Sequence, residues 1–406
     1  MPQVAPVETI RGVFPALLRE HAGRPVAYFD GPGGTQVPRQ VVDAVTRHLV
    51  HHNANRRWAY PSSAETDAQV DAARRGMADF LGCHPADVIF GPNMTTLTFH
   101  LSRAVGRTLG RGDEVVVTRL DHLANVWPWK ALEAERGVRV REVRFEPSDG
   151  TLDLGALDGA ITSRTRVVAV GWASNALGTV TNLLPVVERA RSVGAMTFVD
   201  AVHAAAHLLP AVRALGCDFL ACSPYKIYGP HAGVLYARAE LVDDLDVPRL
   251  PCSPQDAPER FETGTGSFEA MAGTLAAVDF LASLSAGGTR RERLGTVYAE
   301  LHRRGEGLLA RMWAGLEEMP GVKLYGPPPG SRRTPTLAFT VAGRDARSVA
   351  EHLAEAHAVF VSHGHFYAAH VTEDLGVETG LVRAGCACYT TEEEVDRLIQ
   401  GVAELL

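Results

Sequence analysis

The sequence lacks the features that would place the protein in a membrane, outside the cell or on nucleic acid. No run of about 18 apolar residues occurs, and the N-terminal segment has no apolar core of a signal peptide. The net charge is −7, and no basic patch stands out, which disfavours nucleic acid as a partner. We therefore expect a cytoplasmic protein without a membrane or nucleic-acid partner.

Cysteine is scarce and is not arranged in pairs. The six cysteines form no CxxC unit, and a chain of 406 residues does not need disulfide bonds to hold its core. Reduced thiols are therefore expected. The six are Cys83, Cys217, Cys222, Cys252, Cys386 and Cys388.

The chain also lacks low-complexity tracts and internal repeats. Hydrophobic residues make up 46% and charged residues 21%, as in a globular protein. The length predicts two or three folding units. We expect a large domain over residues 61–265 and a linking helix with a smaller domain over 266–406. The first 60 residues should pack on the smaller domain.

Apolar β-branched segments alternate with helical segments in the middle of the chain. This alternation predicts βαβ units, and hence an α/β fold whose sheet is covered on both faces. Beyond residue 266 the pattern predicts an α+β unit, closed by a helix with a capping box at Thr390 or Thr391 and Glu393 or Glu394. Strands are expected at 114–120, 139–145, 166–173, 196–200, 217–223, 233–238, 334–343, 359–362 and 380–389, and helices at 128–137, 154–161, 185–194, 268–319, 346–358 and 391–406.

Polar residues follow five of the apolar segments. In parallel α/β sheets, ligands bind beyond the carboxyl ends of the strands, so these side chains should meet at one edge. They are Asn93, Thr95 and Thr96; His122 and Asn125; Asn175; Asp200 and His203; and Ser223 and Lys226.

Lys226 stands among small, aromatic and turn residues, with little charge nearby. Burial lowers the pKa of a lysine, and a neutral amine forms a Schiff base with an aldehyde. Pyridoxal phosphate, the common aldehyde cofactor, also needs a carboxylate at its ring nitrogen and an anion site. Asp200 suits the first need, and the helix start at 93–96 suits the second. Each residue alone also has an ordinary structural explanation, as surface charge, strand end or helix cap, and the joint pattern favours the cofactor.

Several segments resemble class V aminotransferase-fold enzymes, in particular the cysteine desulfurase-like branch. The segment "VDAVHAAAHLLPAVRALGCDFLACSPYKIYGPHAGVLY" is similar to the lysine region of that family, and "DHLANVWPW", "SNALGT", "RFETGT" and "VRAGCACYTTEEEVDRL" are similar to further elements. The resemblance spans nearly the whole chain. It implies a pyridoxal phosphate enzyme of fold type I, with a mostly parallel seven-stranded sheet in the large domain. It also implies a homodimer with shared active sites that acts on an amino acid.

The resemblance assigns a role to each matching residue. Lys226 would carry the cofactor and then move the Cα proton, with His122 stacked on the ring and Asp200 at its nitrogen. The phosphate would be bound by Ser223, His203, the amides of Met94 and Thr95, and Thr265 of the other chain. Arg383 would hold the substrate carboxylate, with Asn175 near that carboxylate or a cofactor oxygen.

Two positions depart from the family pattern. Tyr225 precedes the lysine where typical desulfurases carry histidine, and Tyr367 falls where the persulfide-forming cysteine aligns. A phenol cannot accept a sulfane sulfur. Cys386 and Cys388 are interpreted as core or edge thiols. These departures put the sulfur chemistry of desulfurases in doubt for this chain.

Three other features are interpreted more simply. The four histidines of residues 357–370 follow no metal-site spacing, so no metal is expected, and His363 or His365 should line the substrate mouth. The turn "GPGG" at 31–34 lacks the lysine of a P-loop and should face the site. Arg56 and Arg57 either enter the partner's active site or remain solvated.

The expected activity is lyase-type chemistry at the β-carbon of an α-amino acid, through an enamine or aminoacrylate, without a persulfide cysteine. Carbon–sulfur and carbon–carbon cleavage both remain open. The alternatives are a class V aminotransferase, an enzyme that forms carbon–carbon bonds in a biosynthetic pathway, and an inactive regulator with the same fold.

Overall fold

Buried β-branched segments form the central sheet of the protein. The computed structural model describes residues 4–406, and in it seven strands pair in the order β4-β12-β11-β10-β9-β5-β6. Neighbouring strands are parallel except where β12 pairs with β11 and β4. This confirms the predicted sheet. The strands are β4 (Val88–Gly91), β5 (Glu114–Thr118), β6 (Arg139–Val143), β9 (Thr165–Gly171), β10 (Met196–Asp200), β11 (Phe219–Cys222) and β12 (Gly233–Ala237).

Helices cover both faces of this sheet, as the unbroken apolar strands require. Val115 and Val117 of β5 join the core cluster that contains Trp129, whereas Val116 between them joins the cluster that contains Val186. This alternation is the period-2 geometry of a strand that is buried on both sides. One face is covered by α4 (Met94–Gly106), α5 (Trp127–Arg136) and α9 (Ala239–Asp244), and the other by α3 (Pro61–Leu81), α6 (Leu154–Ala160), α7 (Leu183–Ser192), α8 (Val212–Leu215) and α10 (Phe268–Ser283).

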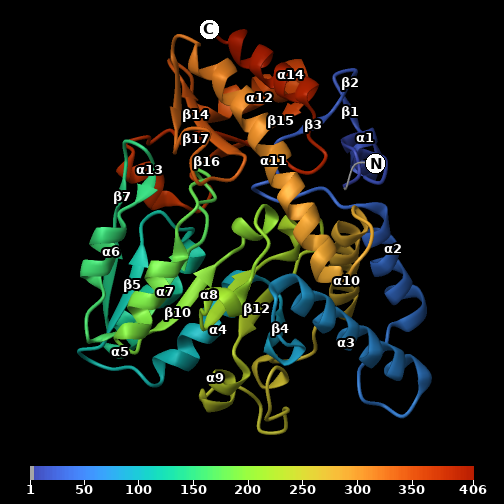
Figure 1. The fold of residues 1–406 in the computed structure, drawn as a ribbon, viewed down its shortest axis with the longest axis vertical. Coiled ribbons are helices and arrows are strands. Elements are labelled where there is room, and N and C mark those ends of the chain that lie inside the picture. Colours follow the sequence, from blue (N-terminus) through green and yellow to red (C-terminus); the bar gives the residue numbers. More distant parts are fainter. Residues whose placement is uncertain (1–3) are drawn as a thin grey trace.

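A second, antiparallel sheet lies above the large sheet in Figure 1, and the long helix α11 extends from one to the other. Its order is β13-β14-β17-β16. The predicted capping box is present, since Thr391 and Glu394 bond each other's backbone amides at the start of α14. The elements are α11 (Arg290–Glu317), β13 (Val322–Tyr325), β14 (Thr336–Val341), α12 (Ala346–His357), β16 (Ser362–Gly364), α13 (Ala369–Asp374), β17 (Leu381–Gly385) and α14 (Glu392–Ala403).

The N-terminal segment contacts both parts of the molecule. Strand β3 (Ala27–Tyr28) pairs with β15 (Val359–Phe360) beside the small sheet. Phe14 packs edge-on against Phe280 of α10 and against Tyr389, which follows the small sheet. The domain limits at residues 60 and 265 stay a prediction, and residues 1–3 of the predicted first segment lie outside the described residues. The remaining elements of this segment are α1 (Val7–Arg11), β1 (Glu20–His21), β2 (Arg24–Pro25) and α2 (Arg39–Arg47).

Four predicted elements had wrong boundaries. The helix expected at 268–319 is two helices, because Gly287 and Gly288 adopt φ of 79° and 68° between α10 and α11. The strand expected at 380–389 ends at Gly385, and that at 359–362 contributes to two separate sheets. The strand expected at 139–145 is also two strands, since β6 is followed by the hairpin of β7 (Phe145–Glu146) and β8 (Thr151–Leu152).

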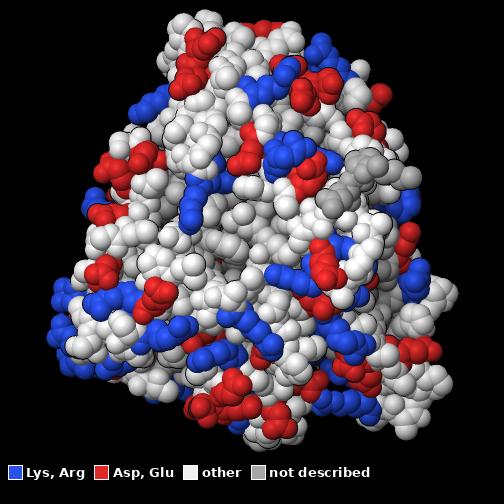
Figure 2. All heavy atoms as spheres, viewed as in Figure 1, with Lys and Arg blue, Asp and Glu red and all other residues white. Residues whose placement is uncertain are grey.

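Basic and acidic side chains are interspersed over the face shown in Figure 2, and the surface near its centre is mostly uncharged. No helix within residues 4–406 combines the length and the apolar character needed to cross a bilayer.

Candidate active site

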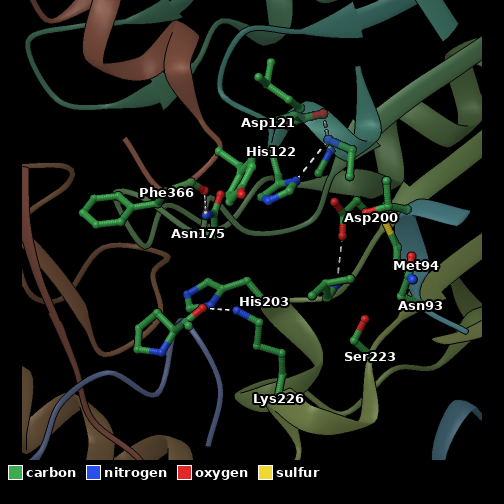
Figure 3. Close-up of a pocket in the computed structure, with 18 of the residues that line it drawn as sticks. Asn93, Met94, Asp121, His122, Asn175, Asp200, His203, Ser223, Lys226 and Phe366 are labelled. Atoms are coloured by element: carbon green, nitrogen blue, oxygen red, sulfur yellow. Dashed lines mark hydrogen bonds between the residues drawn. The ribbon is translucent and has the colours of Figure 1, made fainter. Parts of the chain in front are cut away.

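A cavity of about 1020 Å³ opens at the carboxyl edge of the large sheet. Most of the predicted site residues line it, although they come from sequence positions far apart. Figure 3 shows several of them around this cavity. The predicted residues in the lining are Met94, Thr95, His122, Asn175, Asp200, His203, Ser223, Tyr225, Lys226, Tyr367 and Arg383.

Lys226 lies in a short 3-10 helix after β11 and is 6% exposed. Its Nζ donates a hydrogen bond to the backbone oxygen of Pro32 in the predicted "GPGG" turn. Burial and the nearby charge of Arg383 lower the pKa of Lys226 to about 7, and Asp200 and Asp30 partly oppose this. A substantial fraction of the amine is therefore unprotonated near neutral pH, as a nucleophile requires.

Asp200 ends β10 and lies at the floor of the cavity. Burial raises its pKa to about 6, while the backbone N–H of Val202 (2.9 Å) and the charge of Lys226 favour its ionised form. Asp121 lies in the same floor, and burial raises its pKa to about 7. The amides of Gly171 and Asn125 donate to Asp121 at 2.9 and 2.8 Å. Asp200 thus has one carboxylate oxygen free for a cationic ring nitrogen, whereas Asp121 uses its Oδ2 to hold the loop after β5 against β9.

The first turn of α4 offers backbone N–H groups to an anion. Asn93 caps the helix by accepting from the N–H of Thr96 at 2.8 Å. A Cβ on Gly233 of β12 would lie 2.4 Å from the backbone carbon of Asn93, so glycine is needed for this close approach. In Figure 3, Ser223 lies on the same side of the cavity as Asn93 and Met94. This group has the backbone N–H groups and the hydroxyl of an anion site, and its binding of the cofactor phosphate stays a prediction.

Two histidines in the cavity wall are neutral. Burial, together with Lys226 and Arg383, lowers the pKa of His122 to about 4, and its Nδ1 accepts from the N–H of Ala124 at 3.0 Å. His203 is fully buried, and its Nε2 lies 3.0 Å from the hydroxyl of Thr334, while its Nδ1 has no partner in the protein. In Figure 3, His203 lies toward the amino group of Lys226 and Ser223 lies on the opposite side of the cavity.

Arg383 of β17 is held in place from three directions. Its Nη1 donates to the backbone oxygen of Asn175 at 2.7 Å, and its Nε and Nη2 donate to the hydroxyl of Ser362 at 3.2 and 3.1 Å. The guanidinium stacks on the Phe366 ring, 4.1 Å from the centroid. Burial lowers the pKa of Arg383 to about 9, so it remains cationic at neutral pH. The Oδ1 of Asn175 is buried without a partner, so both residues retain polar atoms for a ligand.

Three predicted site residues lie elsewhere. Thr265 is exposed and, with Arg56, lines a second cavity of about 670 Å³. Arg56 is engaged by Asp67 and Glu259, each at 2.7 Å. His365 is exposed, is not in the lining of the first cavity, and accepts from the N–H of Tyr367 at 3.0 Å.

None of the six cysteines lines the first cavity. Cys222, Cys386 and Cys388 are buried, and burial raises the pKa of each thiol to about 12. Such thiols are protonated at neutral pH and are poor nucleophiles. This geometry agrees with the interpretation of Cys386 and Cys388 as core thiols.

Several functional neighbours were not singled out from the sequence. Asp30 lies near Lys226 and Arg383, and burial raises its pKa to about 6. Phe366 covers Arg383, and Asp121 supports the floor. Of these residues, only Asp121 could have been predicted from the sequence, because it directly follows a predicted strand and precedes His122. Within residues 4–406 the side chains close enough to hold a metal ion are His352, His357 and Glu404, outside this cavity.

The chemistry of the cavity fits pyridoxal phosphate. The unprotonated amine of Lys226 can form a Schiff base with the cofactor aldehyde. The carboxylate of Asp200 can form an ion pair with the ring nitrogen, and the N–H groups at the start of α4 can bind the phosphate. The unpartnered Nδ1 of His203 and Oδ1 of Asn175 are buried polar atoms of the kind that a bound polar group satisfies.

Comparisons with known proteins agree with this geometry. The sequence profile of the family "Aminotransferase class-V" matches residues 27–398. The chain belongs to this family. A cysteine desulfurase from Pectobacterium carotovorum is 32% identical over 98% of both chains. The structure of the apo cysteine desulfurase from Thermococcus onnurineus NA1 is similar, with a TM-score of 0.88 and 27% identity, covering 100% of this chain and 98% of that one. An Escherichia coli cysteine desulfurase in an S-sulfonic acid form has a TM-score of 0.86 at 25% identity, covering 99% and 100%.

The family membership confirms the resemblance seen in the sequence, the fold type and pyridoxal phosphate as the cofactor of this class-V aminotransferase-family protein. It is a cysteine desulfurase-like enzyme. The roles of individual site residues stay predictions.

Proposed function

We propose that this protein cleaves a bond at the β-carbon of an α-amino acid without forming a persulfide on a cysteine of its own. The observation that carries the proposal is the composition of the cavity. Tyr367 lines it, where the sequence resemblance predicts the desulfurase cysteine, and every cysteine of the chain lies outside it. A desulfurase needs a thiolate within reach of the substrate sulfur, and no such thiol lines this cavity.

The cofactor supplies an aldehyde that condenses with an amine and a ring that accepts the electron pair released at Cα. The protein supplies the positions and the protons. Arg383 donates to the substrate carboxylate, and the Nζ of Lys226 takes the Cα proton. Asn175 lies beside that carboxylate or a cofactor oxygen, where the second N–H of its side-chain amide can donate while the first bonds Phe366. Asp200 holds a proton on the ring nitrogen, because a buried carboxylate favours a facing cation. His122 would lie against the cofactor ring, and its neutral form would avoid a second positive charge there.

In the proposed β-elimination, the Cα–H and Cβ–substituent bonds break, and the leaving group departs with its electron pair and is protonated. Hydrolysis of the unsaturated product consumes one water and yields pyruvate and ammonia. No external oxidant or reductant is needed. In a transamination, by contrast, the amino group stays on the enzyme until a second keto acid accepts it, and a keto acid of the whole substrate is released.

Product analysis distinguishes these reactions. Purified protein with cofactor is incubated with cysteine, an S-substituted cysteine and other amino acids, and sulfide, thiol, pyruvate, alanine and keto acids are assayed. We expect thiol and pyruvate in equal amounts from the S-substituted cysteine. Sulfide with alanine from cysteine contradicts the proposal and restores desulfurase chemistry, whereas the keto acid of the intact substrate supports the aminotransferase alternative. A protein that lacks visible absorbance and is unchanged by Lys226→Ala is an inactive regulator.

We also infer a homodimer in which Thr265 serves the partner's site. Thr265 is exposed and lies outside the lining of the first cavity of its own chain, which suits a residue that acts across an interface. Sedimentation should give twice the chain mass, and Thr265→Val should weaken cofactor binding. A monomer that binds the cofactor as tightly as the dimer contradicts this inference.

A further inference from the structure

Two large aromatic side chains lie exposed at the cavity. Tyr367 is 67% exposed and Trp127 is 55% exposed, and both belong to the lining. Single exposed apolar side chains are common on folded proteins, but several that gather at one cavity form an apolar contact surface for a ligand. Leu123 and Phe99 extend this apolar lining.

The backbone holds Tyr367 rigidly. Phe366 and Tyr367 adopt φ of 53° and 56°, a strained region for residues other than glycine. The side-chain amide of Asn175 donates to the backbone oxygen of Phe366 at 2.9 Å, and the N–H of Leu123 donates to that of Tyr367 at 2.7 Å. Both donors lie within residues 61–265, the predicted large domain. Their hydrogen bonds therefore hold the strained turn of the small domain against the large domain at the cavity.

The two rings of this turn cover two site residues. Phe366 stacks on Arg383, and the Tyr367 ring lies 5.5 Å from the ring of His122 at an angle of 32°. The turn therefore forms a fixed aromatic wall beside the residues that bind the cofactor and the carboxylate. A fixed wall selects a substrate by shape better than a mobile segment does.

The charges of the lining exclude a charged substrate side chain. Its cationic residues are Lys226 and Arg383, which bind the cofactor and the substrate carboxylate in the proposed function, while His122 is neutral. Its acids, Asp121 and Asp200, are buried in the floor. The lining that comes from one chain thus provides no free partner for an acidic or basic side chain, and burying an unpaired charge is costly.

The cavity is also large for a small amino acid. Its volume of about 1020 Å³ is at the upper end of the range of about 300–1,000 Å³ for pockets that hold drug-sized ligands. This volume has to hold the cofactor and the substrate together, and Trp127 and Tyr367 belong to its lining.

We propose that the substrate is an α-amino acid whose β-substituent is bulky and apolar, aromatic groups included, and that this substituent lies between Trp127 and Tyr367. The proposal rests on the proposed function, because it takes that substituent as the leaving group.

The test is equilibrium binding, read from the change in the visible absorbance of the holoenzyme. Alanine, cysteine, aspartate, phenylalanine and S-benzylcysteine are titrated into the wild type and into Trp127→Ala, Trp127→Phe and Leu184→Ala. Leu184 is an exposed residue of α7 outside the lining, so its variant controls for a general loss of surface. Product release from S-benzylcysteine is measured separately.

We expect phenylalanine and S-benzylcysteine to bind at least tenfold more tightly than alanine and aspartate. Trp127→Ala should weaken both aromatic ligands about tenfold and leave alanine unchanged, since only the aromatic ligands lose a ring contact. Trp127→Phe should restore most of the lost affinity, because it keeps an aromatic ring. Tighter binding of cysteine or aspartate overturns the inference, as does a Trp127→Ala variant that changes the oligomeric state but not the affinities.

The same experiments give different results if the proposed function, rather than the substrate class, is wrong. If no amino acid changes the absorbance of the holoenzyme, the enzyme activity itself is refuted. If phenylalanine and S-benzylcysteine bind tightly but S-benzylcysteine gives no thiol, the substrate class stands and the lyase reaction falls.

Discussion

The Nη1 of Arg383 donates to the backbone oxygen of Asn175 at a distance of 2.7 Å. The two residues belong to different sheets, since Arg383 lies in β17 of the small sheet and Asn175 follows β9 of the large one. This bond fixes the guanidinium relative to the cofactor pocket before any substrate binds. Preorganisation of this kind reduces the entropy that substrate binding must overcome.

Replacing Arg383 by lysine should weaken substrate binding at least tenfold. Lysine keeps the charge but loses the planar fork that bonds Asn175, Ser362 and a carboxylate together. The dissociation constant, read from the cofactor absorbance, should rise for every amino acid, whatever its side chain.

Arg311→Lys is the matched control for that substitution. Arg311 forms an exposed ion pair with Asp396 at 2.6 Å on the surface of α11, so its replacement should leave substrate affinity unchanged. Equal affinities for the wild type and Arg383→Lys would refute the role of Arg383 in carboxylate binding.

Reconstitution of the apoenzyme with pyridoxal phosphate should accelerate with pH up to about 7 and then level off. The pKa of Lys226 is lowered to about 7, mainly by burial, and the neutral amine is the reactive form. Below this pKa the neutral fraction, and with it the rate, grows about tenfold per pH unit. Stopped-flow absorbance measures this rate.

Asp30→Asn should shift the pH dependence of the reconstitution rate in a known direction. Asp30 raises the pKa of Lys226 by its charge, so removing that charge should move the midpoint to lower pH. A midpoint that moves to higher pH, or a wild-type rate that is constant between pH 6 and 9, would show that the protonation of Lys226 does not control cofactor binding.

The sequence located the residues at strand ends, because the carboxyl edge of a parallel sheet follows from the order of its elements. Lys226, Asp200, Ser223 and His122 were predicted in this way, and the structure brings them together. The partner of Lys226, the carbonyl of Pro32, is 194 residues away in the chain, and its approach depends on how the N-terminal segment folds back. Local sequence patterns carry no information on such a contact.

The turn at Phe366 could not be predicted from the sequence either, because it also depends on contacts between residues far apart in the chain. Its positive φ falls on Phe366 and Tyr367, which follow Gly364, and bonds from Asn175 and Leu123 hold it in place. His365 was predicted at the substrate mouth, but the same turn places its neighbours Phe366 and Tyr367 in the lining instead.

Gly233→Ala should weaken cofactor binding more than it affects the rest of the fold. The added Cβ would lie 2.4 Å from the backbone carbon of Asn93, so the start of α4 must move away from β12. The displaced N–H groups should bind phosphate less well, and the dissociation constant of the cofactor should rise at least tenfold.

Gly159→Ala is the control for Gly233→Ala. Gly159 lies within α6, and a Cβ there meets no atom within 4 Å, so alanine should stabilise the protein by about 0.5–1 kcal/mol. Thermal unfolding with and without cofactor measures both effects. Unchanged cofactor affinity in Gly233→Ala would show that the start of α4 does not bind the phosphate.

Tyr367→Cys should give the enzyme a persulfide that the wild type does not form. Tyr367 lies in the cavity, and the sequence resemblance predicts the desulfurase cysteine at this position. A cysteine there is exposed enough to ionise more readily than the buried Cys386. After incubation with cysteine, mass spectrometry of alkylated protein should find an added sulfur on residue 367. Tyr367→Ser offers a similarly small side chain without a thiol and should gain no added sulfur.

If wild-type protein already carries added sulfur on one of its own cysteines, the proposal of a reaction without a persulfide is wrong. If Tyr367→Cys stays unmodified while it still binds cysteine, Tyr367 does not occupy the position from which a desulfurase takes its sulfur.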